Sequence, residues 1–401
     1  MTPEFHANNR RQLAQRLRGG VFALSNYTGM QRSADAAFNF EPEANFWYLA
    51  GISEPDWWLI IDGARDKSWL VEPDVSDISR VFDGGLSTAE AKEISGVDKV
   101  ITEAEAADLL RDLSKTHSVI YSIGDPVGAD NFSFTLNPAP RNLWRRLERT
   151  FRSVQDATLD LSRLRAIKQP DEIKQIKKAI TLTTEAFSHV KSQLQQTRYE
   201  YEIEAEFSHY FRSRGARGHA YDPIVAAGKN ACTLHYSTNQ LRLKTGQLVL
   251  IDVGARLGGY AADITRTYAY GEISAFSRQV HEAVAESHQK IIDLLRPGLS
   301  IAEYHRQSDL IMKRAMLDLK LIKSLDDQNY RRYFPHAISH GLGIDVHDML
   351  GRPEEFAPGM VLTVEPGIYI PEKSVGVRIE DNILITKSGC ENLSRNLSTD
   401  S

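Results

Sequence analysis

The sequence predicts an α/β protein built from two domains. Strands alternate with helices over residues 9–151, the composition changes near residues 156–170, and long charged helices and strand-rich blocks follow. The chain has 401 residues, enough for a separate core in each domain. We expect an N-terminal α/β domain with a mixed sheet over residues 1–158 and a second domain over residues 159–401.

The composition excludes several classes of protein. The hydrophobic and charged fractions, 42% and 25%, are those of an ordinary globular chain. A net charge of −5 without a basic stripe argues against a nucleic-acid partner. The sequence contains no apolar run of about 18 residues and no apolar leader, so we expect no membrane association. Two distant cysteines, Cys232 and Cys390, indicate a reducing compartment, and we expect a cytoplasmic protein.

The first domain shows clear element signals. We expect helices near residues 9–18, 88–94, 103–113 and 141–151, and strands near 21–25, 58–62, 68–73 and 118–123. Ser87 or Thr88 would cap the second of these helices and Gly96 would end it. The aromatic segment 46–58 is typical of a core or a subunit interface, so we expect a homo-oligomer, either a dimer or a tetramer.

The second domain begins with a long charged helix, residues 171–195. Pro170 suits its first turn, where Asp171 and Glu172 complement the positive helix end. Further helices are expected at 201–214, 274–295 and 300–317, with strands within 337–348, 359–370 and 375–386. Residues 182–214 and 284–317 share a helix–turn–helix pattern, which indicates an internal duplication.

The segment Leu248–Thr267 predicts two strands joined by a tight turn at Leu257-Gly258-Gly259. With a loop of Leu257 and Gly258, Asp252 would lie opposite Asp263, with Cβ atoms roughly 5 Å apart. Carboxylates that close repel each other unless one is protonated or cations lie between them. The alternative is a solvent-facing pair at a sheet edge.

Three further acid or imidazole positions fit a metal centre. Glu365 ends an apolar strand, and Glu380 lies within another, where alternation places Arg378 on the same face. His340 opens a Gly-x-Gly segment, and His347 is expected to end the strand that follows.

Two aspartates, two glutamates and one histidine form a ligand set that is mostly hard oxygen. Such a set suits two divalent cations bridged by carboxylates, with manganese, cobalt, iron or zinc as candidates. Two ions can activate a shared water and polarise a carbonyl group, which is the chemistry of amide or ester hydrolysis.

The motifs IDVG…ADITRT, ISHGLGIDVHD, LTVEPGIYI and VRIEDNILIT, in that order, resemble those of the pita-bread metallopeptidases. The resemblance covers most of the chain. Residues 226–237 are similar to the substrate-histidine segment of the proline-specific branch, and residues 32–55 to the N-terminal domain of aminopeptidase P. It implies a catalytic domain with a curved antiparallel sheet and pseudo-two-fold symmetry. It also implies a metal-dependent exopeptidase whose substrates are peptides with proline at the second position.

The resemblance also implies roles for individual residues. The expected ligands of two divalent ions, Mn²⁺ first and Co²⁺, Fe²⁺ or Zn²⁺ as alternatives, are Asp252, Asp263, His340, Glu365 and Glu380. Asp263 and Glu380 would bridge the ions, and Glu365 would also assist proton transfer from the bridging water to the leaving nitrogen. The expected catalytic or substrate contacts are His235, His347, His336, Arg378, Tyr221, Tyr369 and Arg352.

Each of these positions also has an ordinary structural explanation. Arg378 and Glu380 could form a plain ion pair, Tyr221 and Tyr369 could be core tyrosines, and the histidines could be packing residues. The loop that carries Arg352 looks shorter than in the longer bacterial enzymes.

Three other functions remain open from the sequence. A prolidase, which cuts only Xaa-Pro dipeptides, would need a positive group for the free carboxylate, and Arg352 could supply it. A peptide-binding protein on an inactive fold, or a metal-free creatinase-like hydrolase, would be expected to lack ligands that this chain retains.

Overall fold

The computed structural model describes residues 1–126, 129–131 and 133–401, and the chain divides into two compact units, Met1–Leu164 and Arg165–Ser401. The boundary between the two units lies within helix α7 (Thr158–Ala166). The predicted boundary after residue 158 lies at the start of this helix, and we keep it as a proposal.

The first unit is built on a mixed sheet, as predicted. Its described strands follow the order β6-β5-β4-β1-β7-β8; the pairs β1–β4 and β4–β5 are antiparallel and the others are parallel. These strands are β1 (Val21–Ser25), β4 (Trp58–Asp62), β5 (Lys67–Val71), β6 (Lys99–Ile101), β7 (Val119–Ser122) and β8 (Ser153–Asp156). A small separate hairpin is formed by β2 (Gln31–Ser33) and β3 (Ala36–Ala37).

Helix α4 begins and ends where its capping residues predict, whereas the first helix begins at Pro3, six residues before its predicted start near residue 9. The Ser87 side chain caps α4 and exchanges hydrogen bonds with Glu90, and Gly96 ends the helix in the left-handed conformation at φ 61°. The helices are α1 (Pro3–Arg16), α2 (Ala44–Ala50), α3 (Asp77–Asp83), α4 (Thr88–Ser95), α5 (Glu103–Thr116), the short η1 (Ala129–Asn131) and α6 (Ala139–Thr150).

The aromatic segment 46–58 belongs to the interior of this unit. Phe46 and Tyr48 are 0% and 1% exposed, and Trp47 and Trp58 are also buried. Of the two roles expected for this segment, core or subunit interface, the burial of its rings supports the core. Large exposed apolar side chains lie instead on α3, at Ile78, Val81 and Phe82.

The second unit combines small antiparallel sheets with two helix pairs. Among the described residues the sheets have the orders β10-β11-β14, β13-β12-β9, β15-β18-β19 and β16-β17. Their strands are β9 (Gly218–His219), β10 (Ile224–Ala227), β11 (Gln247–Val253), β12 (Ala255–Leu257), β13 (Tyr260–Ala261), β14 (Ile264–Tyr270), β15 (Val361–Val364), β16 (Gly367–Ile370), β17 (Val375–Arg378), β18 (Asp381–Ile385) and β19 (Cys390–Asn392).

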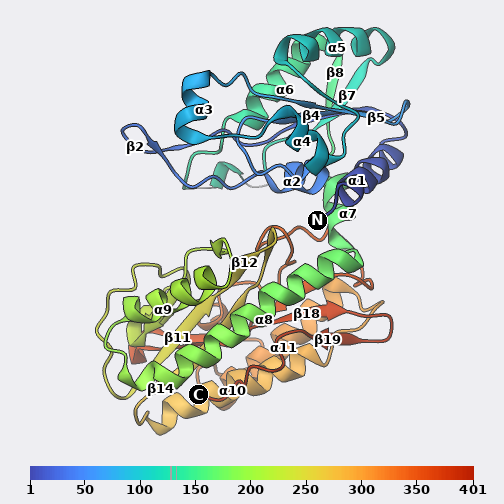
Figure 1. Ribbon diagram of the computed structural model, residues 1–401. Coiled ribbons are helices and arrows are strands. Elements are labelled where there is room, and N and C mark those ends of the chain that lie inside the picture. Colours follow the sequence, from blue (N-terminus) through green and yellow to red (C-terminus); the bar gives the residue numbers. More distant parts are fainter. Residues whose placement is uncertain (127–128, 132) are drawn as a thin grey trace. The chain divides into compact units, whose positions relative to one another are not determined.

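Helix α8 packs against α9 and against the strands β12, β13 and β14, and α10 packs against α11 and the strands β15 to β17 (Figure 1). The helices of this unit are α8 (Pro170–Gln193), η2 (Leu194–Gln196), α9 (Glu200–Ser213), η3 (Gly228–Cys232), α10 (Ala275–Ile292), α11 (Ile301–Asp318), α12 (Tyr330–Tyr333) and η4 (Pro371–Lys373). No described helix combines the length and the apolar character needed to cross a membrane.

The predicted register of the central hairpin is wrong by two residues. Asp252 pairs with Thr265, not with Asp263, because the loop consists of Gly258 and Gly259. Both glycines have positive φ, 60° and 86°, as a tight two-residue hairpin turn requires. A shift of two residues preserves the face, so the two aspartates become diagonal neighbours on the same side of the sheet.

The predicted strand before His347 is also wrong. Residues 337–348 form a loop whose described ladder contacts are single bridges from Gly341 to Asp348 and to Leu362. At Gly341 an added Cβ would lie 2.2 Å from the backbone oxygen of Asp348. The loop folds back on itself too closely for an extended strand.

Candidate active site

Asp252 and Asp263 meet at the hydroxyl of Tyr221. This hydroxyl lies 2.5 Å from Asp252 Oδ1 and 2.6 Å from Asp263 Oδ1, and both aspartates are buried. A tyrosine hydroxyl has a single proton to donate, so it cannot satisfy two ionised carboxylates at once. Arg378 Nη2 donates to the other oxygen of Asp252, which leaves Asp263 as the carboxylate that needs a further proton or a cation.

Glu380 joins this pair from the segment between β17 and β18. Its backbone N–H donates to the Thr265 carbonyl oxygen at 3.0 Å, and its Oε2 accepts from Thr265 Oγ1 at 2.6 Å. Its other carboxylate oxygen, Oε1, is buried and has no hydrogen-bond partner among the described residues. A buried carboxylate oxygen without a donor is costly unless a cation or a proton occupies the space in front of it.

His340 and Glu365 complete the cluster. His340 Nε2 lies 3.4 Å from Asp263 Oδ2 and 3.5 Å from Glu365 Oε1. His340 Nδ1 lies 2.9 Å from the Gly341 carbonyl oxygen, and because a carbonyl can only accept, Nδ1 carries a proton. This hydrogen bond leaves Nε2 directed at the carboxylates, as in a histidine that binds a metal.

The electrostatics of the cluster follow from crowding buried carboxylates together. Burial and the neighbouring Asp263 and Glu365 raise the pKa of Glu380 well above its usual value. Burial, partly offset by His340, raises the pKa of Glu365 to about 7. Burial alone would lower the pKa of His340, but Asp263 and Glu365 raise it to about 9. Burial is the largest cause of the two glutamate shifts, and the neighbouring carboxylates add to it, whereas at His340 the carboxylates outweigh burial.

These residues fit divalent cations. Atoms of Asp263, His340 and Glu380 lie within 4.8 Å of one another, close enough to contact one ion. The unpartnered Oε1 of Glu380 and the shared Tyr221 hydroxyl both indicate missing positive charge. Oxygen-rich donors with one imidazole suit metals such as manganese.

Arg378 connects the cluster to Tyr369 and His336. Its guanidinium donates to Asp252 Oδ2 at 2.5 Å and to the Tyr369 hydroxyl at 2.9 Å. The same hydroxyl lies 2.8 Å from His336 Nε2, and His336 Nδ1 lies 3.5 Å from Glu365 Oε2. Arg378 thus bonds Asp252 directly. It reaches Glu380 through Thr265 Oγ1, which accepts from Arg378 Nε and donates to Glu380 Oε2.

The remaining predicted residues are more exposed. The ring of His347 lies 4.3 Å from the ring of His340, measured between centroids. His235 is exposed on the loop after η3, and it is close enough to His336 and His347 to count among the causes that lower the pKa of both. Arg352 is exposed and has a left-handed backbone at φ 53°, and no described contact joins it to the cluster.

Two threonines were not predicted from the sequence. Thr265 Oγ1 donates to Glu380 and accepts from Arg378 Nε at 3.2 Å, and Thr363 Oγ1 accepts from the His340 backbone N–H at 3.1 Å and lies 3.2 Å from Glu365 Oε1. Each lies two residues from an acidic member of the cluster. The period of two along a strand could have revealed them.

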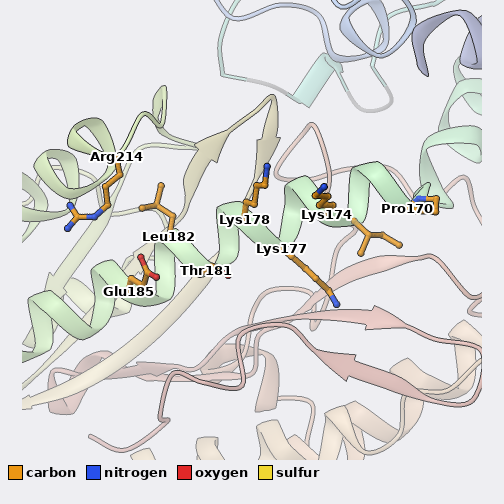
Figure 2. Close-up of a pocket in the computed structure, with 9 residues that line it drawn as sticks. Pro170, Lys174, Lys177, Lys178, Thr181, Leu182, Glu185 and Arg214 are labelled. Atoms are coloured by element: carbon orange, nitrogen blue, oxygen red, sulfur yellow. The ribbon is translucent and has the colours of Figure 1, made fainter. Parts of the chain in front are cut away.

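A cavity of about 620 Å³ lies elsewhere, along the exposed side of α8 (Figure 2). Its lining includes Lys174, Lys178 and Arg214, and none of the predicted site residues. The candidate active site is therefore defined by its buried polar groups and not by this cavity.

Comparisons with known proteins find similarity over most of the chain. Residues 174–387 match the model of metallopeptidase family M24, and residues 6–121 match that of the aminopeptidase P N-terminal domain. The chain is 35% identical to the Xaa-Pro aminopeptidase of Escherichia coli, over 93% of this chain and 89% of that protein. It is 33% identical to human Xaa-Pro aminopeptidase 3, over 92% of this chain and 76% of that protein.

Among solved structures, Escherichia coli aminopeptidase P with the inhibitor Pro-Leu superimposes with a TM-score of 0.86. The identity is 31%, and the match covers 99% of this chain and 96% of that chain.

Proposed function

The chain belongs to metallopeptidase family M24, and we infer that it is a metal-dependent exopeptidase that removes an N-terminal residue preceding proline. The observation that carries this conclusion is the buried cluster around Asp263, in which His340 is directed at carboxylates and Glu380 keeps an unpartnered oxygen. Relatives named Xaa-Pro aminopeptidase, from bacteria to mammals, support the choice of substrate.

Two divalent ions per subunit, Mn²⁺ first, are the proposed cofactor. The residues that would hold them are Asp252, Asp263, His340, Glu365 and Glu380. When bound, the ions would supply a nucleophilic hydroxide at neutral pH and polarise the scissile carbonyl.

The protein's own groups would move the proton and hold the substrate. Glu365 would accept a proton and deliver it to the leaving nitrogen. His347 and His235 would contact the substrate and stabilise its tetrahedral oxyanion. Arg378 would orient Asp252 and Tyr369, and Tyr221 would hold the two aspartates together.

Recognition of proline has a specific physical requirement. The scissile nitrogen is tertiary and has no N–H, so the site must read the shape of the ring. We assign His336 and Tyr369, which contact each other at 2.8 Å, to the leaving-group side, and Arg352 to the substrate entrance. The inhibitor Pro-Leu of the Escherichia coli structure begins with proline, as the released fragment would.

The deciding experiment uses peptides of two lengths. Metal-stripped protein, with and without added Mn²⁺, would be given Xaa-Pro and Xaa-Pro-Yaa-Zaa. We expect cleavage of the longer peptide only after Mn²⁺ is restored. Cleavage of the dipeptide alone would move the assignment to a prolidase, and no cleavage of either peptide would contradict the proposed activity.

We also propose a cytoplasmic homo-oligomer, a dimer or a tetramer. Free Cys232 and Cys390 fit a reducing compartment. Ile78, Val81 and Phe82 expose 71%, 84% and 81% of their surface on α3, which makes this helix the surface to test for self-association. Light scattering of the wild type and of a Phe82→Glu variant would test the oligomeric state.

A further inference from the structure

A second cluster of buried charges lies in the unit that carries the active site, outside the candidate metal ligands. Arg165 Nη2 lies 2.8 Å from Asp348 Oδ1, and Lys168 Nζ lies 3.2 Å from Asp348 Oδ2. The side chains of these three residues are 5%, 1% and 3% exposed, in the order Arg165, Lys168, Asp348. Two cations from the segment before α8 therefore enclose one carboxylate.

This carboxylate directly follows His347 in the chain. The Asp348 backbone N–H donates to the Gly341 carbonyl oxygen at 2.8 Å, and Gly341 is the residue after His340. The loop between the two histidines is thus closed by a backbone hydrogen bond at its base. Arg165 Nη2 also reaches the Asp345 carboxylate at 2.7 Å, so the same guanidinium holds the loop at a second point.

The backbone of the loop is packed directly against the charge cluster. A Cβ added at Gly343 would lie 2.0 Å from Asp348 Oδ2 and 3.1 Å from Lys168 Cε. On its other side, the Gly343 carbonyl accepts from the Ala261 N–H at 2.9 Å, next to the hairpin that carries Asp263. The loop is therefore held between the ion cluster and the metal-site hairpin.

The side chain of His347 has no comparable support of its own. No described residue forms a hydrogen bond with its ring, and its described ring contact is with His340. Its position therefore depends on the backbone that carries it. That backbone is fixed one residue later, where Asp348 meets Arg165 and Lys168.

We propose that Asp348, held by Arg165 and Lys168, is a positioning residue that sets His347 against the metal ligand His340 for reaction with the substrate. The proposal rests on the proposed function. Burying three charges together costs desolvation free energy, and such clusters often serve geometry better than stability. A misplacement of a reacting group by about 1 Å is enough to cost roughly 100-fold in rate.

The test is a double-mutant cycle on the metal-loaded full chain, with Xaa-Pro-Yaa-Zaa as substrate. In the wild-type background we expect Asp348→Asn to lower kcat by roughly 10- to 100-fold, with KM and bound metal little changed. In the His347→Ala background the same substitution should have almost no further effect on kcat, because the group it positions is gone. Independent, multiplicative effects would overturn the proposal.

Two more variants guard against a simple folding defect. Lys168→Met keeps Arg165 as a counter-ion, so it serves if Asp348→Asn does not fold, and the same loss of kcat and the same cycle are expected. Lys177→Met on α8 is the matched control, because its ammonium pairs with Glu391 at the surface and not with this loop. We expect Lys177→Met to leave kcat unchanged.

The measurements distinguish failure of the proposed function from failure of the positioning role of Asp348. A wild type inactive on every Xaa-Pro peptide would refute the proposed function and the positioning role with it. An active wild type whose Asp348→Asn and Lys168→Met variants fold and retain full kcat would refute the positioning role alone.

Discussion

Glu380 and Asp381 are neighbours in the chain, are 2% exposed each, and meet opposite surroundings. Glu380 contacts the hairpin at Thr265 and faces other carboxylates, and burial with Asp263 raises its pKa well above the usual value. Asp381 points to the other side of the strand, where Arg266 Nη2 donates to its Oδ1 at 2.6 Å. Burial would raise the pKa of Asp381, but Arg266 and then His288 lower it to about 2.

The difference shows what separates a structural carboxylate from a candidate ligand. Asp381 has its counter-ion, and Asn392 Nδ2 donates to its second oxygen at 2.6 Å, so every acceptor is used. Glu380 has equal burial and one unpartnered oxygen. Burial alone therefore does not mark a metal site; burial among like charges does.

Glu380→Gln should have the largest effect of any change to this pair. Activity should fall by roughly 10³-fold or more, because a buried carboxylate of the candidate metal cluster loses its charge. The metal-free variant should be at least as stable as metal-free wild type, because the substitution removes repulsion. Peptide kinetics, metal content and urea unfolding of both metal-free proteins check this. A metal-free variant clearly less stable than wild type would contradict our view of Glu380.

Asp381→Asn should lower stability strongly and leave metal binding intact, the reverse of Glu380→Gln. It leaves Arg266 buried without its counter-ion, so the free energy of unfolding should fall by about 3–5 kcal/mol. The variant that remains folded should still bind metal. Urea unfolding measures the loss, and the double variant Arg266→Met/Asp381→Leu, which removes both charges, should recover part of it. A loss of unfolding free energy no larger than that of an ordinary surface substitution would contradict the structural role that we assign to Asp381.

In the metal-free protein, the candidate metal cluster and the Asp381 ion pair should change stability with pH in opposite directions. The pKa of Glu365 is raised to about 7 and that of His340 to about 9, so the stability they contribute is present at low pH and is lost as pH rises through those values. The pKa of Asp381 is lowered to about 2, so its contribution is present above the ordinary aspartate pKa and is lost as pH falls through 2.

Thermal unfolding of metal-free protein between pH 5 and 9 tests the alkaline limb. We expect the midpoint to fall as pH rises through about 7 and Mn²⁺ to remove much of that fall, because cations compensate the ionised carboxylates. A midpoint that rises over the same range without metal would mean that the carboxylates are not repelling one another.

Thr265→Val should have the smallest effect of the four. It removes the hydroxyl that donates to Glu380 at 2.6 Å and accepts from Arg378, so kcat/KM should fall by roughly tenfold. Thr267→Val is the matched control, since Thr267 lies on the same face but bonds only backbone atoms of Arg378. Equal losses of activity in both variants would show that the effect is one of strand packing.

Much of the fold was predictable because its signals are local. The Ser87 cap, the Gly96 helix end and Pro170 at the start of α8 act within a few residues, and the structure has these helix boundaries at or within a residue of their predicted positions. The candidate ligands were predictable because acidic residues are rare in otherwise apolar strands. Asp263, Glu365 and Glu380 stand out from their neighbours in the sequence itself.

The sequence by itself thus determined the chemistry of the site, namely which carboxylates and which imidazole are available. Only the tertiary structure decided how they meet. The hairpin register depended on which glycines form the loop, so Asp252 came to pair with Thr265. The burial of the aromatic side chains within residues 46–58 and the enclosure of Asp348 by Arg165 and Lys168 depend on segments far apart in the chain. Local patterns carry no record of such distant partners, because desolvation and pairing are settled only when the chain has folded.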